Sequence, residues 1–222
     1  IPLTRSRVSE QIDLLAKGKR RPQRYSAGRR VTKRLFNRSN MLEGEKEIVE
    51  RAKGGEAEAF GALYDHYQPK IYRFVLLKTS HKETAEDLTH QAFLAAWQNI
   101  HKFSHRGFPF GSWLYQIAKN SVIDHYRAAK PTTPLENVAE LISSSVNHEE
   151  RADSRLKIQS VYEALKQLSG DHQDVIIMRF IEELSPGEIA KALGKTEGAV
   201  RVMQHRALSA LKNTLKEKWK AK

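Results

Sequence analysis

The sequence contains no cysteine among its 222 residues, which excludes disulfide bonds, thiolate catalysis and cysteine-ligated zinc. It also lacks any run of about 18 apolar residues, the length that a membrane-spanning helix needs. The first residues lack the apolar core of a signal peptide. We therefore expect a cytoplasmic protein without membrane insertion.

Motifs for enzymatic chemistry are missing as well. The sequence has no Gly-rich phosphate loop and no Gly-x-Ser-x-Gly element. Asp124 and His125 are neighbours on an expected helix and would point about 100° apart, so they do not form an acid–base pair. His101 and His105 have a spacing that suits zinc, but no third ligand is evident. We expect no enzyme activity, no cofactor and no metal site.

Basic residues are in excess, and the excess lies at one end of the chain. The formal net charge is +12, of which residues 1–40 carry +10, with twelve Lys and Arg against Glu10 and Asp13. Low hydrophobicity and high charge predict a disordered basic leader over residues 1–40. The alternatives are a nucleic-acid-binding arm and a segment outside the native start. No function is assigned to this leader.

Helical periodicity dominates the rest of the chain. From Gly44 onward, apolar residues recur at helical spacing, and no run of alternating β-branched residues indicates a strand. The sequence therefore predicts an all-α protein. Pro69 should end one helix and allow the next to begin. The helices expected in this part of the chain cover residues 45–55, 56–68, 70–80, 82–100 and 111–128.

A linker divides the helical part into two domains. Residues 130–148 carry two prolines and a run of serines, which is typical of a flexible connection. Further helices are expected over residues 149–168, 171–181, 186–193 and 196–218. The predicted organisation is a leader (1–40), a helical domain (41–129), a flexible linker (130–148) and a second helical domain (149–222).

The second domain contains two short helices with clear boundaries. Ser185, Pro186 and Glu188 predict a capped helix start, because Ser and Glu can each accept a hydrogen bond from the other's backbone amide. Gly194 suits the left-handed residue that follows a helix. Thr196 can then cap the next helix. Two helices joined by a tight Gly-containing turn are typical of a helix-turn-helix.

The second of these helices has one apolar and one basic face. Its apolar stripe consists of Val200, Met203, Ala207 and Leu211. Its opposite side presents Arg201, His205 and Lys212. This arrangement favours insertion of the outer face against a negatively charged partner such as duplex DNA.

An earlier segment combines aromatic with basic residues. It reads FPFGSWLYQIAKNSVIDHYRAAK over residues 108–130, and its polar members include Lys119, Asn120, Asp124 and Arg127. Unpaired bases stack on aromatic rings while cations hold the backbone, so this composition suits single-stranded nucleic acid. The apolar members are expected to belong to the core: Trp113, Leu114, Ile117 and Ala118.

Three ordered segments carry a family resemblance. They are AEDLTHQAFLAAW (85–97), FGSWLYQIAKNSVIDHYR (110–127) and LSGDHQDVIIMRFIEELSPGEIAKALGKTEGAVRVMQHRALSAL (168–211), with the Pro/Ser linker between the last two. In this order and spacing, the chain resembles RNA polymerase sigma factors of the extracytoplasmic-function (ECF) group in the sigma-70 superfamily. The resemblance implies core RNA polymerase and promoter DNA as partners. An anti-sigma factor is a further family expectation.

The resemblance also implies a role for each segment. The helix over residues 82–100 would bind the clamp helices of core polymerase, with Asp87, His90 and Gln91 at the contact positions. The family usually has Gln and then Glu at the positions of His90 and Gln91. The next helix would capture the opened minus-ten strand, the linker would thread toward the polymerase active centre, and the helix-turn-helix would read the minus-thirty-five duplex.

The expected nucleic-acid contacts fall into two sets. For strand capture we expect Lys119, Asn120, Asp124 and Arg127, with Phe110 and Tyr115 as stacking or loop-shaping residues. For the duplex we expect Lys195, Thr196, Arg201, Val202, His205 and Arg206. Arg201 and His205 point outward, whereas Arg206 and Lys195 suit phosphate contacts. The family often has an arginine where this chain has Met203, so its base preference cannot be copied from relatives.

Two other functions are compatible with a helix-turn-helix. A stand-alone regulator would bind operators as a dimer, but it would need neither a strand-capturing helix nor a polymerase-binding helix. An interaction protein with a vestigial helix-turn-helix would not need a basic outer face. The sequence favours the sigma factor over both.

Overall fold

The computed structural model describes residues 41–105, 107–128 and 151–220, and this part of the chain consists of helices and connecting turns without a β-strand. The all-α prediction is therefore confirmed. The predicted leader (1–40) and linker (130–148) lie outside the described residues.

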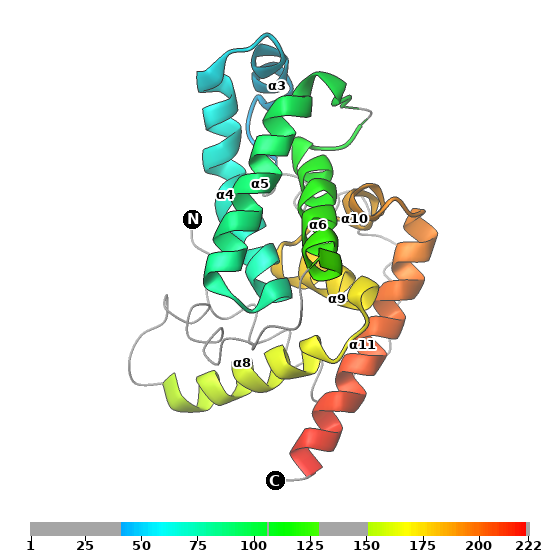
Figure 1. The fold of residues 1–222 in the computed structure, drawn as a ribbon. Helices are drawn as coiled ribbons and strands as arrows, with labels where there is room; N and C mark the ends of the chain where they lie inside the picture. Colours follow the sequence, from blue (N-terminus) through cyan, green and yellow to red (C-terminus); the bar gives the residue numbers. More distant parts are fainter. Residues whose placement is uncertain (1–40, 106, 129–150, 221–222) are drawn as a thin grey trace.

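The first unit is a helical bundle formed by residues 41–105 and 107–128 (Figure 1). Helix α4 packs against the three other helices of the unit, and α5 also packs against α6. Its core is rich in large side chains, including Leu63, Tyr67, Phe74, Phe110 and Leu114. The elements are α3 (Glu45–Lys53), α4 (Ala57–Thr79), α5 (Lys82–Asn99), the 3-10 turn η1 (Ile100–Lys102) and α6 (Phe110–Ala128).

The break predicted at Pro69 is wrong, because α4 continues through it as one helix. A proline inside a helix lacks the N–H donor and costs about 3 kcal/mol. On either side of Pro69, however, α4 buries Tyr67, Ile71 and Phe74 almost completely. Burying such side chains contributes about 1.5–3 kcal/mol each, which offsets the cost of the proline.

The second unit holds the helix-turn-helix. Its elements are α8 (Arg151–Lys166), α9 (Gly170–Ile176), the π-helical turn η2 (Ile177–Ile181), α10 (Pro186–Leu193) and α11 (Glu197–Lys220). The predicted capping box is present, since Ser185 Oγ accepts from Glu188 N–H at 3.2 Å and the Glu188 carboxylate accepts from Ser185 N–H at 2.7 Å. Gly194 follows α10 in the left-handed conformation, with φ of 63°, as expected.

The helix expected over residues 171–181 is irregular in its second half. After α9, the backbone widens into η2, where Glu182 N–H donates to the Ile177 carbonyl at 3.0 Å. A π turn adds a residue to the helical repeat and so rotates the side chains that follow. Ile177 and Met178 stay buried, while the Glu182 carboxylate meets Arg73 of the first unit.

The two units pack against each other. Helix α10 packs beside α6 (Figure 1), and η2 contacts α4. The helix expected to capture single strands is therefore covered on one side by the unit expected to read the duplex.

Candidate nucleic-acid and polymerase interfaces

The predicted duplex contacts lie together at the start of α11 and in the turn before it. Thr196 caps the helix, because its Oγ1 accepts from Ala199 N–H at 3.2 Å. Val200 and Ala207 are fully buried and fix the rotation of α11 about its axis. The exposed residues on the other side of α11 and in the turn before it form a surface that we call the duplex surface. It consists of Lys195, Thr196, Arg201, Val202, His205 and Arg206.

The duplex surface consists of polar and charged side chains and one apolar side chain, that of Val202. Arg201 forms an ion pair with Glu197 one turn earlier, and both side chains are more than half exposed. An exposed pair of this kind contributes little, so Arg201 can exchange Glu197 for a base edge or phosphate at small cost. Val202 is 50% exposed, and an apolar side chain at this position suits the methyl group of thymine.

The predicted strand-capture residues divide between two faces of α6. Asn120, Asp124 and Arg127 form an exposed stripe, which we call the open stripe of α6. Within it, Arg127 lies 3.6 Å from Asp124. These three side chains are available to a nucleic-acid strand in the conformation that the structure shows.

The remaining strand-capture residues are covered. Phe110 is fully buried among aromatic rings of the first unit, so in this conformation it shapes the loop and does not stack on a base. Tyr115 is buried and donates to Glu182 at 3.1 Å. Burial raises the pKa of Tyr115, and the Glu182 carboxylate adds to the rise, so the phenol stays protonated and remains a donor. The Lys119 side chain is only 15% exposed.

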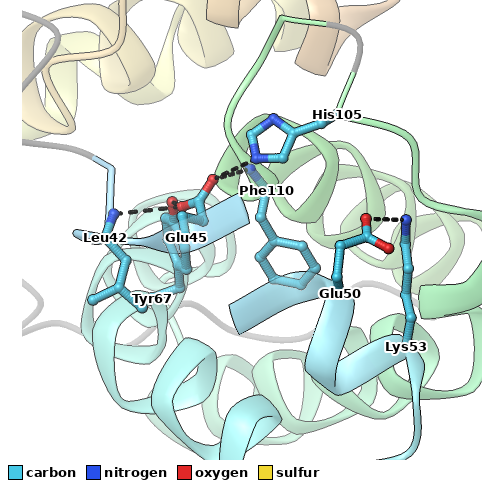
Figure 2. Close-up of polar contacts among 7 residues, drawn as sticks. All are labelled: Leu42, Glu45, Glu50, Lys53, Tyr67, His105 and Phe110. Atoms are coloured by element: carbon cyan, nitrogen blue, oxygen red, sulfur yellow. Dashed lines mark hydrogen bonds and ion pairs between the residues drawn. The ribbon is translucent and has the colours of Figure 1, made fainter. Parts of the chain in front are cut away.

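A buried carboxylate positions the start of α6. Glu45 on α3 accepts from Phe110 N–H at 2.7 Å, from Leu42 N–H at 3.4 Å and from the Tyr67 hydroxyl (Figure 2). His105 Nε2 lies 3.7 Å from the same carboxylate. A negative charge at a helix N-terminus is stabilised by the unpaired amides and by the helix dipole. Glu45 therefore ties the loop before α6, and α6 itself, to α3 and α4.

Tyr67 reinforces this attachment. Burial raises the pKa of the Tyr67 hydroxyl, and the Glu45 carboxylate raises it further, so the hydroxyl keeps its proton and donates a hydrogen bond to Glu45. The Tyr67 ring also lies close to Gly111, where an added Cβ would stand 2.5 Å from Cε1. Glycine at position 111 is therefore needed for α6 to approach α4 this closely.

The outer face of α5 presents the predicted polymerase contacts. Asp87, His90 and Gln91 are all exposed. Leu94 lies one turn further along the same face and is 57% exposed, although it is a large apolar residue. Together these four residues form a mixed polar and apolar strip, which we call the α5 strip.

Two family models match the chain, one in each unit. Sigma-70 region 2 matches residues 63–132, and Sigma-70 region 4 matches residues 164–213. The first match contains the α5 strip and the open stripe of α6. The second contains the duplex surface.

Curated relatives agree over most of the chain. The ECF RNA polymerase sigma factor SigD of Mycobacterium bovis is 31% identical over 80% of this chain and 87% of its own length. The chain belongs to the ECF sigma factors. The ECF sigma factor BldN of Streptomyces coelicolor is 37% identical over 76% of this sigma factor, which spans 65% of BldN. SigW of Bacillus subtilis is 29% identical over 78% of this sigma factor and 97% of SigW.

Two solved structures share the fold of this sigma factor. CnrH, in complex with the cytosolic domain of CnrY, superposes with a TM-score of 0.61 at 23% identity, covering 78% of this sigma factor and 97% of that chain. RpoE, in complex with the anti-sigma factor NepR from Bartonella quintana, gives a TM-score of 0.55 at 23% identity. The match covers 72% of this sigma factor and 98% of the RpoE chain. The family consists of DNA-binding transcription initiation factors that direct RNA polymerase to promoters.

Sequence reasoning missed several residues of this sigma factor. Leu94 has the spacing of the α5 strip, so a search for apolar residues off the core stripe would have found it. Arg73 and Lys78 on α4 pair with Glu182 and Asp174 of the second unit. No local pattern signals such pairs, because the partners are about a hundred residues apart in the sequence.

Neither a metal site nor a membrane span is found in the described residues. No three His, Asp or Glu side chains within 41–105, 107–128 and 151–220 gather closely enough to hold a metal ion. In the same part of the chain, no helix combines the length and the apolar character needed to cross a bilayer.

Proposed function

We propose that this sigma factor divides promoter recognition between its two units. The second unit reads the minus-thirty-five duplex with the duplex surface of α11. The first unit binds core RNA polymerase through the α5 strip and holds the opened minus-ten strand with α6. The observation that carries the proposal is that one chain presents three exposed faces of different chemistry, each on a separate helix.

Each face suits its assigned partner. The duplex surface offers Arg201 and His205 to base edges and Lys195 and Arg206 to phosphates. The open stripe of α6 offers an amide, a carboxylate and a guanidinium, which can bind the exposed edges of an unpaired base. The α5 strip places an apolar side chain among polar ones, as is common at protein–protein contacts.

The proposal assigns this chain to the cytoplasm, where core polymerase acts, and includes an anti-sigma factor as a partner. Both follow from family membership. The fold-level neighbours support the second point, because one is described in complex with an anti-sigma factor. The regulator would have to cover at least one of the three faces to inhibit initiation.

Reconstituted transcription tests the proposal. The purified chain is added to core polymerase with a fragmented genomic template, and transcript starts are sequenced. We expect starts to cluster downstream of one shared pair of sequence elements, and to vanish when the chain is omitted. A chain that binds duplex operators tightly but never co-purifies with core polymerase would instead be a stand-alone regulator.

A further inference from the structure

Three cations of the first unit are paired with carboxylates of the second. Arg73 binds Glu182 through two hydrogen bonds, at 2.6 and 2.8 Å. Lys78 Nζ lies 2.7 Å from Asp174 Oδ1. We call Arg73, Lys78 and Lys119 the covered cations.

Lys119 completes the set from α6. Its Nζ lies 3.6 Å from Asp171 and 3.9 Å from Asp174. Tyr115, one turn before it, donates to Glu182. We call Asp171, Asp174 and Glu182 the acidic clamp. The clamp therefore holds one face of α6 together with the neighbouring face of α4.

The covered cations have the chemistry of a strand-binding surface. Proteins that hold single strands combine cations for the backbone with aromatic side chains for the bases. Here two lysines and an arginine face the acidic clamp together with Tyr115, whose hydroxyl shares Glu182 with Arg73. Lys119 is the sequence neighbour of Asn120 in the open stripe of α6. Arginine can form bidentate hydrogen bonds with a carboxylate or with a phosphate. The carboxylates of the acidic clamp therefore occupy positions beside the covered cations that phosphates could fill.

The packed arrangement cannot persist on a promoter. Elements at minus ten and minus thirty-five lie about 25 base pairs apart, which is about 85 Å at roughly 3.4 Å per base pair. A compact chain of this length has a radius of gyration of only about 17 Å. The two units must therefore separate for each to reach its element, and separation exposes the covered cations.

We propose that the structure is a closed resting form, in which the acidic clamp occupies phosphate-binding positions, and that Arg73 and Lys78 join Lys119 in binding the captured strand after opening. This inference rests on the proposed function. It adds Arg73 and Lys78 as strand-binding residues, and it makes the acidic clamp a competitor of the promoter phosphates within the same chain. Promoter phosphates and core polymerase replace the clamp when the units separate.

The energetics of the clamp suit a form that opens. The side chains of Glu182 and Asp174 are almost completely buried. Burial raises the pKa of both carboxyl groups, although Arg73 and Lys78 respectively oppose the rise, so holding them ionised is costly. Buried ion pairs often contribute little net stability, because attraction is offset by lost hydration. Separation of the units returns the carboxylates to water and frees the cations to bind phosphate, so the ion pairs themselves add little to the cost of opening.

The test uses the full chain and a fluorescent oligonucleotide with the minus-ten strand sequence of a promoter found by transcript sequencing. The variant Asp174→Asn/Glu182→Gln removes two clamp charges without changing side-chain size. A control variant, Glu47→Gln/Glu58→Gln, removes two exposed charges from α3 and α4, outside the interface. If about nine molecules in ten are closed, we expect the clamp variant to bind the strand about tenfold more tightly than wild type. The control variant should bind like wild type.

A second variant tests the two new binding residues. Adding Arg73→Gln/Lys78→Gln to the clamp variant should abolish the gain, because the freed cations are then missing. An unchanged gain would overturn their assignment. Equal binding by the clamp variant, the control and wild type would overturn the closed form. Thermal unfolding of each variant is monitored by circular dichroism. A gain in strand binding counts as opening of the closed form only if the variant still unfolds cooperatively.

The outcome is separable from that of the proposed function. If the clamp variant shows no gain while the wild type with core polymerase still starts transcription at specific promoters, only the closed form fails. If wild type with core polymerase gives no specific starts, the proposed function fails whatever the oligonucleotide binding shows.

Discussion

Glu45 illustrates how a single buried carboxylate can control the position of a functional helix. It lies at the start of α3, yet it accepts hydrogen bonds both from Leu42 N–H just before α3 and from Phe110 N–H at the first residue of α6. A tyrosine hydroxyl and two backbone amides donate to it, so its buried carboxyl oxygens have hydrogen-bond partners.

Glu45→Gln should destabilise the first unit by about 1–3 kcal/mol, because an amide cannot accept from all three donors and leaves a buried group unsatisfied. Urea unfolding monitored by circular dichroism measures the change. Glu50→Gln is the control: Glu50 is exposed on the same helix and pairs with Lys53 at its surface (Figure 2), so its change should stay within about 0.5 kcal/mol. Equal effects of the two substitutions would contradict the role of Glu45.

Two glycines of the first unit should respond in opposite directions to alanine. Gly111→Ala places a Cβ against the Tyr67 ring and should destabilise by about 1–3 kcal/mol, as overpacking does. Gly61 lies in α4 with open space around its Cβ position, so Gly61→Ala should stabilise by about 0.4–1 kcal/mol. Thermal unfolding of both variants gives the comparison, and a stabilising effect at Gly111 would show that α6 does not pack on Tyr67.

Helix α11 separates its structural side from its recognition side. Arg201→Ala should weaken binding to the minus-thirty-five duplex by about 1–3 kcal/mol if the guanidinium contacts a base. Fluorescence anisotropy with the cognate and a scrambled duplex measures the loss on each. An equal loss on both duplexes would assign Arg201 to a phosphate. The fold should be unaffected, because the side chain is exposed and its ion pair with Glu197 contributes little.

Helix α5 leaves Leu94 exposed at the surface of the part of the chain that the structure describes. Leu94→Arg should weaken binding to core polymerase by about 2 kcal/mol or more, as removal of an apolar anchor commonly does. Asn213→Arg adds the same charge at an exposed position on α11 and should have little effect. Pull-down titrations with core polymerase compare the two. Undiminished binding by Leu94→Arg would move the polymerase contact away from the α5 strip.

At the scale of the elements, periodicity and caps predicted most of the helices. The capping box at Ser185 and the left-handed Gly194 were both predicted, because such signals act within a few residues. Pro69 misled the prediction, since the cost of a proline is local whereas the burial that offsets it comes from the whole bundle. The π turn over η2 has no comparable local signal.

At the scale of the whole molecule, the arrangement of the two units was not predictable from the sequence. The ion pair between Arg73 and Glu182 joins positions 109 residues apart, and either residue alone reads as an ordinary surface charge. The residues predicted to contact the duplex are all exposed, because their exposure depends mainly on the rotation of one helix. The strand-capture set was split between an open and a covered face, since coverage by α10 and η2 depends on tertiary packing.

Promoter opening is the event on which strand capture and duplex reading converge. Permanganate modifies unpaired thymines, so it reports opening directly on a promoter bound by core polymerase and this sigma factor. We expect reactive thymines around the minus-ten element with wild type. With Asn120→Ala, we expect loss of that reactivity while the closed promoter complex still forms in a gel-shift assay. Unchanged reactivity with Asn120→Ala would remove Asn120 from strand capture, and the absence of reactive thymines with wild type would contradict the account as a whole.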